Sequence, residues 1–378
     1  MDILENKHIP VLDGIRAFAV LLVCFVHFFG VDENYLYNSN VIIGSILFKI
    51  SQIGLKGVEL FFLLSGFLIT NILIESKNSS KYFSTFYIRR FLRISPLYYF
   101  VLTICFIVLP QITKVDLAAN NVIEKQVWLW TYTSNLSSFF GNLGWYGGTN
   151  FPGFSHFWSL CVEEHFYVFW PFLIYFSSEK WLPRFMWSIV LISVFSVLFV
   201  YFSNNMIPIF GWTTIRCMGV LSLGGLIAYY KKYPFLYKKI VNISNKTVLP
   251  FGLLFLVVSF IPRRYESQEI LVYFSAVIFF SELIVVSIEG NRFTNLIFNH
   301  KPLFFIGKIS YGIYVYHGIF MFVFVKYFVY LKYYISNGIV GTLMYTIICT
   351  IISIFIAWIS WNIIEKPILI LKKYFTYA

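Results

Sequence analysis

The chain has 378 residues, of which 59% are hydrophobic and 21% aromatic, whereas only 12% are charged. A soluble domain carries roughly 25% charged residues, so this composition excludes an ordinary soluble protein and indicates an all-α polytopic membrane protein. The net charge of +12 does not indicate nucleic acid as a partner, because the basic residues lie in short loops between apolar runs, where they orient a chain in a membrane.

Ten apolar runs have about the length of roughly 20 residues that a helix needs to cross the hydrocarbon core of a membrane. They lie at 11–30, 57–75, 94–110, 155–177, 185–203, 213–230, 248–262, 268–288, 303–328 and 338–363. The seventh run is short and is bounded by Pro250 and Pro262. No segment between the runs is long enough for a soluble domain, so we predict a single transmembrane domain over 1–378 with no removable signal peptide.

Lysine and arginine indicate the orientation, since cytoplasmic loops of membrane proteins are enriched in both. With ten spans, most of the 29 Lys and Arg residues fall on the side of the N-terminus. We therefore predict that both termini are cytoplasmic and that the protein is a multi-pass protein of a cytoplasmic membrane.

The first run holds Arg16 near its start and His27 near its end, on one face of the predicted helix. A histidine in lipid must face protein or a water-filled cavity, so His27 is a candidate general base. The second run, GVELFFLLSGFLIT, returns inward and places Glu59 near the depth of His27. A carboxylate beside an imidazole fixes its tautomer and raises its basicity, and the alternative is a structural polar pair between two helices.

The stretch FYIRRFLRISPLYY carries Arg89, Arg90 and Arg93 at the cytoplasmic mouth of the third run, and Arg90 and Arg93 share a face. Guanidinium groups bind phosphate oxygens well, as at a nucleotide-bearing cofactor. On loop position alone, charge that sets the topology is the better explanation.

The fourth run, FSHFWSLCVEEHFYVFWPF, has the most polar residues. A polar stripe with spacings of three and four residues consists of His156, Ser159, Glu163 and Tyr167. Glu164 and His165 point elsewhere. Two adjacent glutamates are costly in lipid, which favours a function for Glu163 and Glu164, and Arg216 is a candidate counter-charge for one of them.

The ninth run, FIGKISYGIYVYHGIF, places Ser310, Tyr314 and His317 on one face, although this histidine equally fits a tolerated interfacial residue. The final IIEKP segment fits a structural role. There is no HExxH or CxxC spacing, no phosphate-binding loop and no GxSxG motif, so we expect no metal and no hydrolase elbow.

Together these stretches resemble the integral-membrane acyltransferase family 3, the bacterial O-acyltransferases of surface glycans, Nod factors and some antibiotics. The resemblance runs in family order from residue 9 to about 367, through the Arg16–His27 pair, GVELFFLLSGFLIT, RRFLRISPLYY, HFWSLCVEEHFYVFWP, KISYGIYVYHGIF and IIEKP. Two departures are His165, where the family usually has glutamine, and the lack of the extracytoplasmic hydrolase-like domain that some members carry.

The resemblance implies a ten-helix domain in a bacterial inner membrane. It implies transfer of an acyl group, usually acetyl, from cytoplasmic acyl-CoA to a hydroxyl of a surface glycan or lipid-linked saccharide, such as O-antigen, capsule or another exopolysaccharide. By position, His27 becomes the catalytic histidine and Arg16 its functional partner, and coenzyme A phosphate becomes the better explanation for Arg90 and Arg93.

Three sets of site residues follow. The catalytic set is His27, Glu59, Glu163 and Glu164; the set for acetyl-CoA is Arg16, Arg90, Arg93, Ser310 and Tyr314; the set for the acceptor is His156, Ser159, Arg216 and His317. In the hypothesis, His27 is oriented by Glu59 or Glu163 and either removes the proton of the acceptor hydroxyl or carries the acyl group itself. A thioester is already activated, so no metal or ATP is needed.

The alternative from another class is a proton-coupled transporter of a small solute or glycan precursor, because intramembrane Glu and His also form proton relays. Transporters commonly show inverted repeats or paired broken helices, and the sequence shows neither. A membrane scaffold is a weaker option, since it does not require His27 and two adjacent glutamates in lipid.

Overall fold

The computed structural model describes residues 9–30, 41–113, 122–136, 153–202, 214–261, 266–324 and 338–377, and every regular element in these ranges is helical. The elements up to the middle of the chain are α1 (Pro10–Phe29), α3 (Val41–Ile53), η1 (Gly54–Lys56), α4 (Gly57–Glu75), α5 (Tyr82–Thr103), η2 (Ile104–Val108), α6 (Leu109–Thr113), α7 (Val122–Trp130) and α8 (Phe157–Phe176). They are followed by α9 (Leu182–Phe202), α10 (Thr214–Lys231), α11 (Pro234–Phe260), α12 (Glu266–Ile288), α13 (Arg292–Phe298), α14 (Lys301–Lys308), α15 (Ser310–Ile319), α16 (Met321–Val323), α18 (Gly338–Ser360), η6 (Trp361–Glu365), α19 (Lys366–Ile370) and η7 (Leu371–Tyr374).

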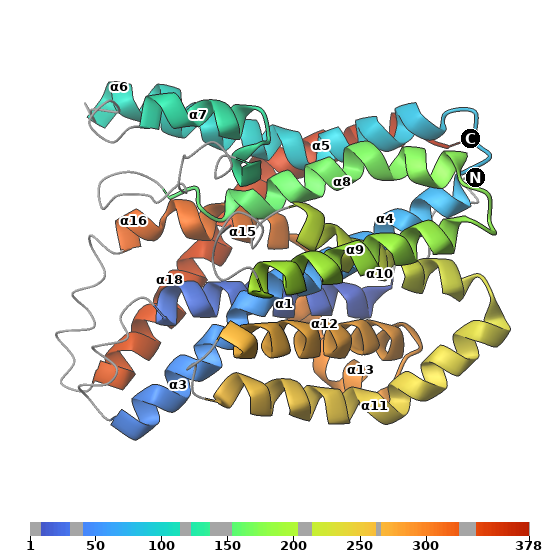
Figure 1. The fold of residues 1–378 in the computed structure, drawn as a ribbon. Coiled ribbons are helices and arrows are strands. Elements are labelled where there is room, and N and C mark those ends of the chain that lie inside the picture. The colour runs from blue at the N-terminus through green and yellow to red at the C-terminus, as the bar shows by residue number, and fades with distance from the viewer. Residues whose placement is uncertain are drawn as a thin grey trace.

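The long helices lie with their axes close to one common direction, and both ends of the chain lie at the same end of this bundle (Figure 1). An even number of membrane crossings requires such an arrangement. The assignment of that end to the cytoplasm remains a prediction from the positive charges.

Seven helical stretches in the described residues are long and apolar enough to cross a membrane. They are Pro10–Phe29, Ile42–Glu75, Tyr82–Ile112, Leu182–Phe199, Pro234–Phe260, Gln268–Ile288 and Gly338–Tyr374. Each contains most or all of one predicted run, so the all-helical, multi-pass class is as expected.

The three other predicted runs correspond to helices that are too polar or too short to meet the same criterion. The run at 155–177 is α8, which contains two glutamates, and the run at 213–230 is α10, which contains Arg216. The described part of the run at 303–328, which ends at residue 324, is divided among α14, α15 and α16. The number of ten membrane crossings therefore remains a prediction.

The predicted boundary of the seventh run was wrong. Pro250 lies inside α11, which begins sixteen residues earlier with Pro234 in its first turn. A proline is tolerated at the first helical position because its missing N–H is not needed there. The hydropathy pattern missed the first half of α11 because that half is polar.

The helices α4 and α10 pack closely through small residues. A Cβ atom on Gly66 would lie 1.9 Å from the carbonyl oxygen of Leu221, and one on Gly224 would lie 2.1 Å from the carbonyl oxygen of Leu63. Only glycine permits two backbones to approach so closely. This contact fixes the rotation of α4 and thereby decides which of its side chains face α8 and which face α10.

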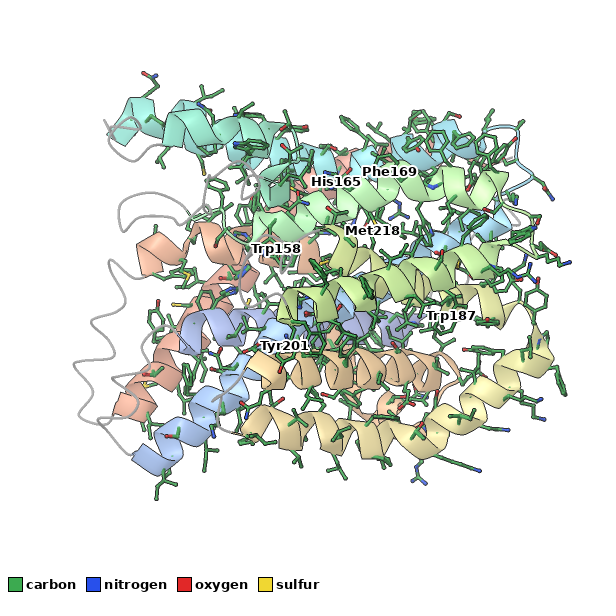
Figure 2. The ribbon with its side chains drawn as sticks, viewed as in Figure 1. Trp158, His165, Phe169, Trp187, Tyr201 and Met218 are labelled. Atoms are coloured by element: carbon green, nitrogen blue, oxygen red, sulfur yellow. The ribbon has the colours of Figure 1, made fainter. Side chains whose placement is uncertain are left out.

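Helix α1 lies inside the bundle and contacts α4, α14, α15 and α18. Its residues Ile15, Ala19 and Val23 are almost completely buried. The outer faces of other helices are apolar instead: Phe169 on α8 is 67% exposed and Trp187 on α9 is 43% exposed (Figure 2). The apolar outer faces fit a lipid environment. Because α1 lies inside the bundle, its polar residues face protein and indicate a site there.

Candidate active site

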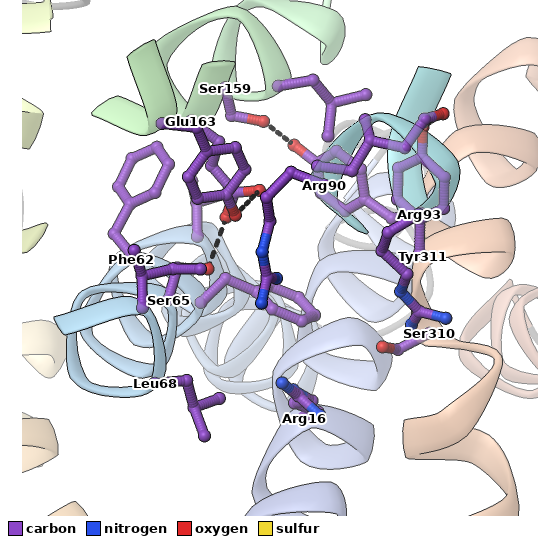
Figure 3. A pocket seen from close by; sticks show the side chains of 17 residues that line it. Arg16, Phe62, Ser65, Leu68, Arg90, Arg93, Ser159, Glu163, Ser310 and Tyr311 are labelled. Carbon is purple, nitrogen blue, oxygen red and sulfur yellow. Dashed lines mark hydrogen bonds between the residues drawn. The ribbon is translucent and has the colours of Figure 1, made fainter. Parts of the chain in front are cut away.

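A pocket opens between α1, α4, α5, α8 and α15, with an empty volume of about 790 Å³ including the space at its mouth (Figure 3). Seven of its lining residues belong to the predicted site, and they are Arg16, Arg90, Arg93, Ser159, Glu163, Ser310 and Tyr314. Helices that are far apart in the sequence thus bring all five residues of the predicted acetyl-CoA set to one cavity.

Three arginines give this pocket a strongly positive wall. Arg16 forms an ion pair of 2.9 Å with Asp13 one turn earlier on α1. Arg90 lies over the ring of Tyr167, and its Nε is buried without a hydrogen-bond partner among the described residues. The guanidinium of Arg93 lies over the ring of Trp361. A buried guanidinium with an unused donor is suited to a ligand with anionic oxygens, such as phosphate.

Hydrogen-bonded polar side chains also line the pocket. Glu163 accepts a hydrogen bond of 2.8 Å from the hydroxyl of Ser65 and another of 3.2 Å from the hydroxyl of Tyr167 (Figure 3). The hydroxyls of Ser159 and Tyr314 are 2.6 Å apart. The stripe predicted on α8 is therefore present, and Glu163 offsets part of the positive charge of the arginines.

The predicted catalytic histidine lies beyond the end of the pocket. Tyr314 lines the pocket, and its ring centroid is 5.4 Å from that of His317 and 5.6 Å from that of His156. His27 contacts His317, with its Nδ1 3.1 Å from Nε2 of that residue. Among the described residues that line the pocket there is no histidine. Tyr314 therefore connects the pocket to His317, and His317 connects it to His27.

Glu59 does not contact His27. Its Oε1 accepts a hydrogen bond of 3.2 Å from Arg216 and lies 3.9 Å from Nζ of Lys56, while Arg216 also covers the ring of Tyr273. The close packing of α4 on α10 turns Glu59 toward α10 and away from α1. The expected partners of His27 and of Arg216 are thus corrected: His27 meets His317, and Arg216 meets Glu59 rather than Glu163 or Glu164.

We expect Glu59→Gln to lower stability rather than transfer activity. The change removes the charge that Arg216 meets, and a hydrogen bond to a charged group contributes about 1.5–3 kcal/mol. Thermal unfolding in detergent should show a lower midpoint, with activity per folded protein within about threefold of wild type. A large loss of activity at unchanged stability would instead place Glu59 in the reaction.

Glu164 and His165 point away from the pocket, as expected. Neither residue lines it, and Nδ1 of His165 lies 3.1 Å from the hydroxyl of Thr214 at the start of α10. His165 therefore joins α8 to α10. The role of Glu164 as a catalytic residue remains a prediction.

Two residues of the site had a weak signal in the sequence. Ser65 donates to Glu163, and Trp361 stacks on Arg93. A serine beside a glycine is common at helix contacts, and a tryptophan near the end of a span is common at the membrane surface, so neither pattern indicates a site. No group of three His, Cys, Asp or Glu side chains that could hold a metal ion occurs in the described part of the chain.

Comparison with known proteins agrees with the resemblance seen in the motifs. The peptidoglycan O-acetyltransferase OatA of Listeria monocytogenes is 29% identical over 335 residues, which are 83% of this chain and 49% of the relative. The O-acetyltransferase OatA of Staphylococcus aureus is 28% identical over 341 residues, or 82% of this chain and 50% of the relative. A putative O-acetyltransferase of S. aureus is 26% identical over 329 residues, with coverages of 83% and 50%.

The chain spans about half the length of these curated relatives. No solved structure matches it. The acyltransferase domain family matches residues 9–362, which is nearly the whole chain. This match confirms the resemblance, and the chain belongs to the acyltransferase family 3 of membrane acyltransferases.

Proposed function

We propose that the protein is a membrane O-acetyltransferase that moves an acetyl group from acetyl-CoA to a hydroxyl of a cell-envelope glycan. The observation that carries the proposal is the positive pocket formed by Arg16, Arg90 and Arg93, which ends at the tyrosine in front of the histidine cluster. Support for acetyl as the acyl group comes from the names of the relatives, all of which are O-acetyltransferases.

Acetyl-CoA fits the chemistry of the pocket. Its phosphates carry several negative charges, which the guanidinium groups of Arg90 and Arg93 bind well in a site shielded from water. Its pantetheine arm is long, thin and flexible, so the thioester reaches farther along the pocket, toward Tyr314. Because coenzyme A is made in the cytoplasm, we assign the arginine end of the pocket to the cytoplasmic side, as the charge distribution predicts.

In the proposed reaction His27 acts as a general base. It takes the proton of the acceptor hydroxyl while the oxygen attacks the thioester carbonyl. The new ester bond forms, the carbon–sulfur bond breaks, and the proton on His27 passes to the leaving thiolate to give free coenzyme A. For this reaction the Tyr314 side chain must move aside, since it lies between the pocket and the histidines.

The acceptor belongs to the bacterial cell envelope. The Listeria relative is named for peptidoglycan, which was not among the polymers expected from the motifs, namely O-antigen, capsule and other exopolysaccharide. We therefore propose peptidoglycan as the first glycan to examine, ahead of those three.

Deletion of the gene tests this function. We expect the O-acetyl content of one envelope glycan to fall, as measured by mass spectrometry of each isolated polymer. Wild-type protein supplied in trans should restore it and the His27→Ala variant should not. Unchanged O-acetylation of every envelope polymer would contradict the proposal, and altered uptake of a solute in the same strain would favour the transporter instead.

A further inference from the structure

His317 lies at the centre of a cluster with His27 and His156, behind Tyr314. Its side chain is completely buried. Its Nδ1 is 2.6 Å from the carbonyl oxygen of Tyr314, and its Nε2 is 3.1 Å from Nδ1 of His27. None of the ion pairs in the described part of the chain includes a histidine.

These contacts determine where the protons of His317 lie. A carbonyl oxygen only accepts hydrogen bonds, so Nδ1 of His317 must carry the hydrogen that it shares with Tyr314. A charged imidazole buried without a carboxylate is costly, so the ring is neutral and has one N–H. Its Nε2 is therefore an acceptor.

The assignment for His317 determines the protonation of His27. Since Nε2 of His317 accepts, Nδ1 of His27 must donate across the 3.1 Å contact. A neutral His27 then has its lone pair on Nε2. The carbonyl oxygen of Tyr314 on α15 thus acts on His27 through His317, which is 290 residues away in the sequence. The His27 ring also has a hydrogen bond to the backbone of Val23 on α1.

His156 holds the cluster from the other side. Its Nε2 is 3.2 Å from the carbonyl oxygen of Val315, so this nitrogen also donates to the backbone of α15. The ring lies so close to that helix that a Cβ atom on Gly318 would lie 2.3 Å from its Nδ1. The His156 ring and the backbone of α15 together leave His317 little freedom to rotate.

We propose that His317 is a positioning residue that holds His27 in the Nδ1–H tautomer, so that Nε2 of His27 receives the proton of the acceptor hydroxyl. This proposal rests on the proposed function, because it assumes that the proton taken by His27 is that of the acceptor hydroxyl. It gives His317 a role different from the acceptor contact expected from the sequence, because both of its ring nitrogens already have protein partners. The sequence led us to expect a carboxylate beside His27, whereas in the structure the imidazole of His317 contacts it.

Nitrogen NMR of the resting protein tests the tautomer without any need for activity. The protein is labelled with ring-¹⁵N histidine and placed in lipid nanodiscs, and the signals of His27 are assigned from their absence in His27→Gln. We expect Nε2 of His27 to give the shift of an unprotonated ring nitrogen and Nδ1 that of an N–H. Protonation of Nε2 as the main form would overturn the proposal.

Two substitutions of His317 test its effect on the reaction. Leucine removes the acceptor for Nδ1 of His27, and we expect kcat to fall about 10- to 100-fold, as when residues that orient histidine ligands of metals are removed. KM for acetyl-CoA should stay within about twofold. Glutamine reaches about as far as Nε2 of histidine and offers an oxygen acceptor, so His317→Gln should regain most of the lost kcat.

The two measurements separate this proposal from the proposed function. If the wild-type protein shows the expected tautomer but no acetyl transfer, the function is wrong and the assignment of protons stands. If His317→Leu is folded by gel filtration and keeps both the wild-type kcat and the wild-type tautomer of His27, the positioning role is wrong. Equal losses in the folded leucine and glutamine variants would also contradict it.

Discussion

Replacing His27 with alanine is expected to lower the rate of acetyl transfer by about 10²- to 10⁴-fold, the usual contribution of a general base. The affinity for acetyl-CoA should remain within about twofold, because His27 lies behind Tyr314 and does not line the arginine pocket. Transfer is measured with radiolabelled acetyl-CoA and a soluble glycan acceptor, and affinity by calorimetry in detergent.

His300 is the matched control for this prediction. It is an exposed histidine next to the start of α14, and its ring contacts only the carbonyl oxygen of Leu296 among the hydrogen bonds of the described residues. We expect His300→Ala to keep wild-type transfer. A folded His27→Ala protein with more than a tenth of the wild-type rate would contradict a catalytic role for His27.

The double change Arg90→Ala and Arg93→Ala should weaken the affinity for coenzyme A by about 10²- to 10⁴-fold, since each charge-assisted hydrogen bond contributes roughly 1.5–3 kcal/mol. The remaining affinity should depend less on salt than that of wild type, because salt screens the contacts that have been removed.

Arg89 provides the control on the same helix. It precedes Arg90 directly, does not line the pocket, and donates to the carbonyl oxygen of Phe375. Arg89→Ala removes one positive charge, as Arg90→Ala alone does, but the variant should retain coenzyme A binding within about threefold. If Arg89→Ala weakens binding as much as Arg90→Ala, the effect comes from the charge of the surface and not from the pocket.

Helical periodicity predicted a large part of this site. Arg90 and Arg93 are three residues apart, Ser159 and Glu163 are four apart, and both pairs line one pocket. A spacing of three or four residues places side chains on one face whatever the neighbouring helices are. The cost of charge in lipid then requires that this face be turned toward the interior of the protein.

The partners across helices could not be read from the sequence. Glu59 was expected beside His27, yet the glycine contact between α4 and α10 turns it to Arg216. His317 was not expected beside His27, because that contact depends on how α15 packs against α1. Periodicity defines the faces of one helix, whereas the rotation of that helix in the bundle is set by packing.

Helix α11 shows the same limit for the fold. Proline was taken as a boundary, but Pro250 lies within a continuous helix of 27 residues. Pro250 has no backbone N–H to donate, and the helix tolerates this because its other residues keep their backbone hydrogen bonds. The number of membrane spans is equally hard to derive from the sequence, because the two glutamates of α8 lower the mean hydropathy of that helix.

The central claim is that acetyl-CoA binds at the arginine end of the pocket and that its acetyl group is transferred, with His27 as general base, to an acceptor on the other side of the membrane. It is tested most directly with oriented proteoliposomes that have labelled acetyl-CoA only on the side of Arg90 and a glycan acceptor only on the opposite side. We predict label on the glycan for wild-type protein and none for His27→Ala. Label that appears only when donor and acceptor share one side, or that persists without His27, would contradict the account.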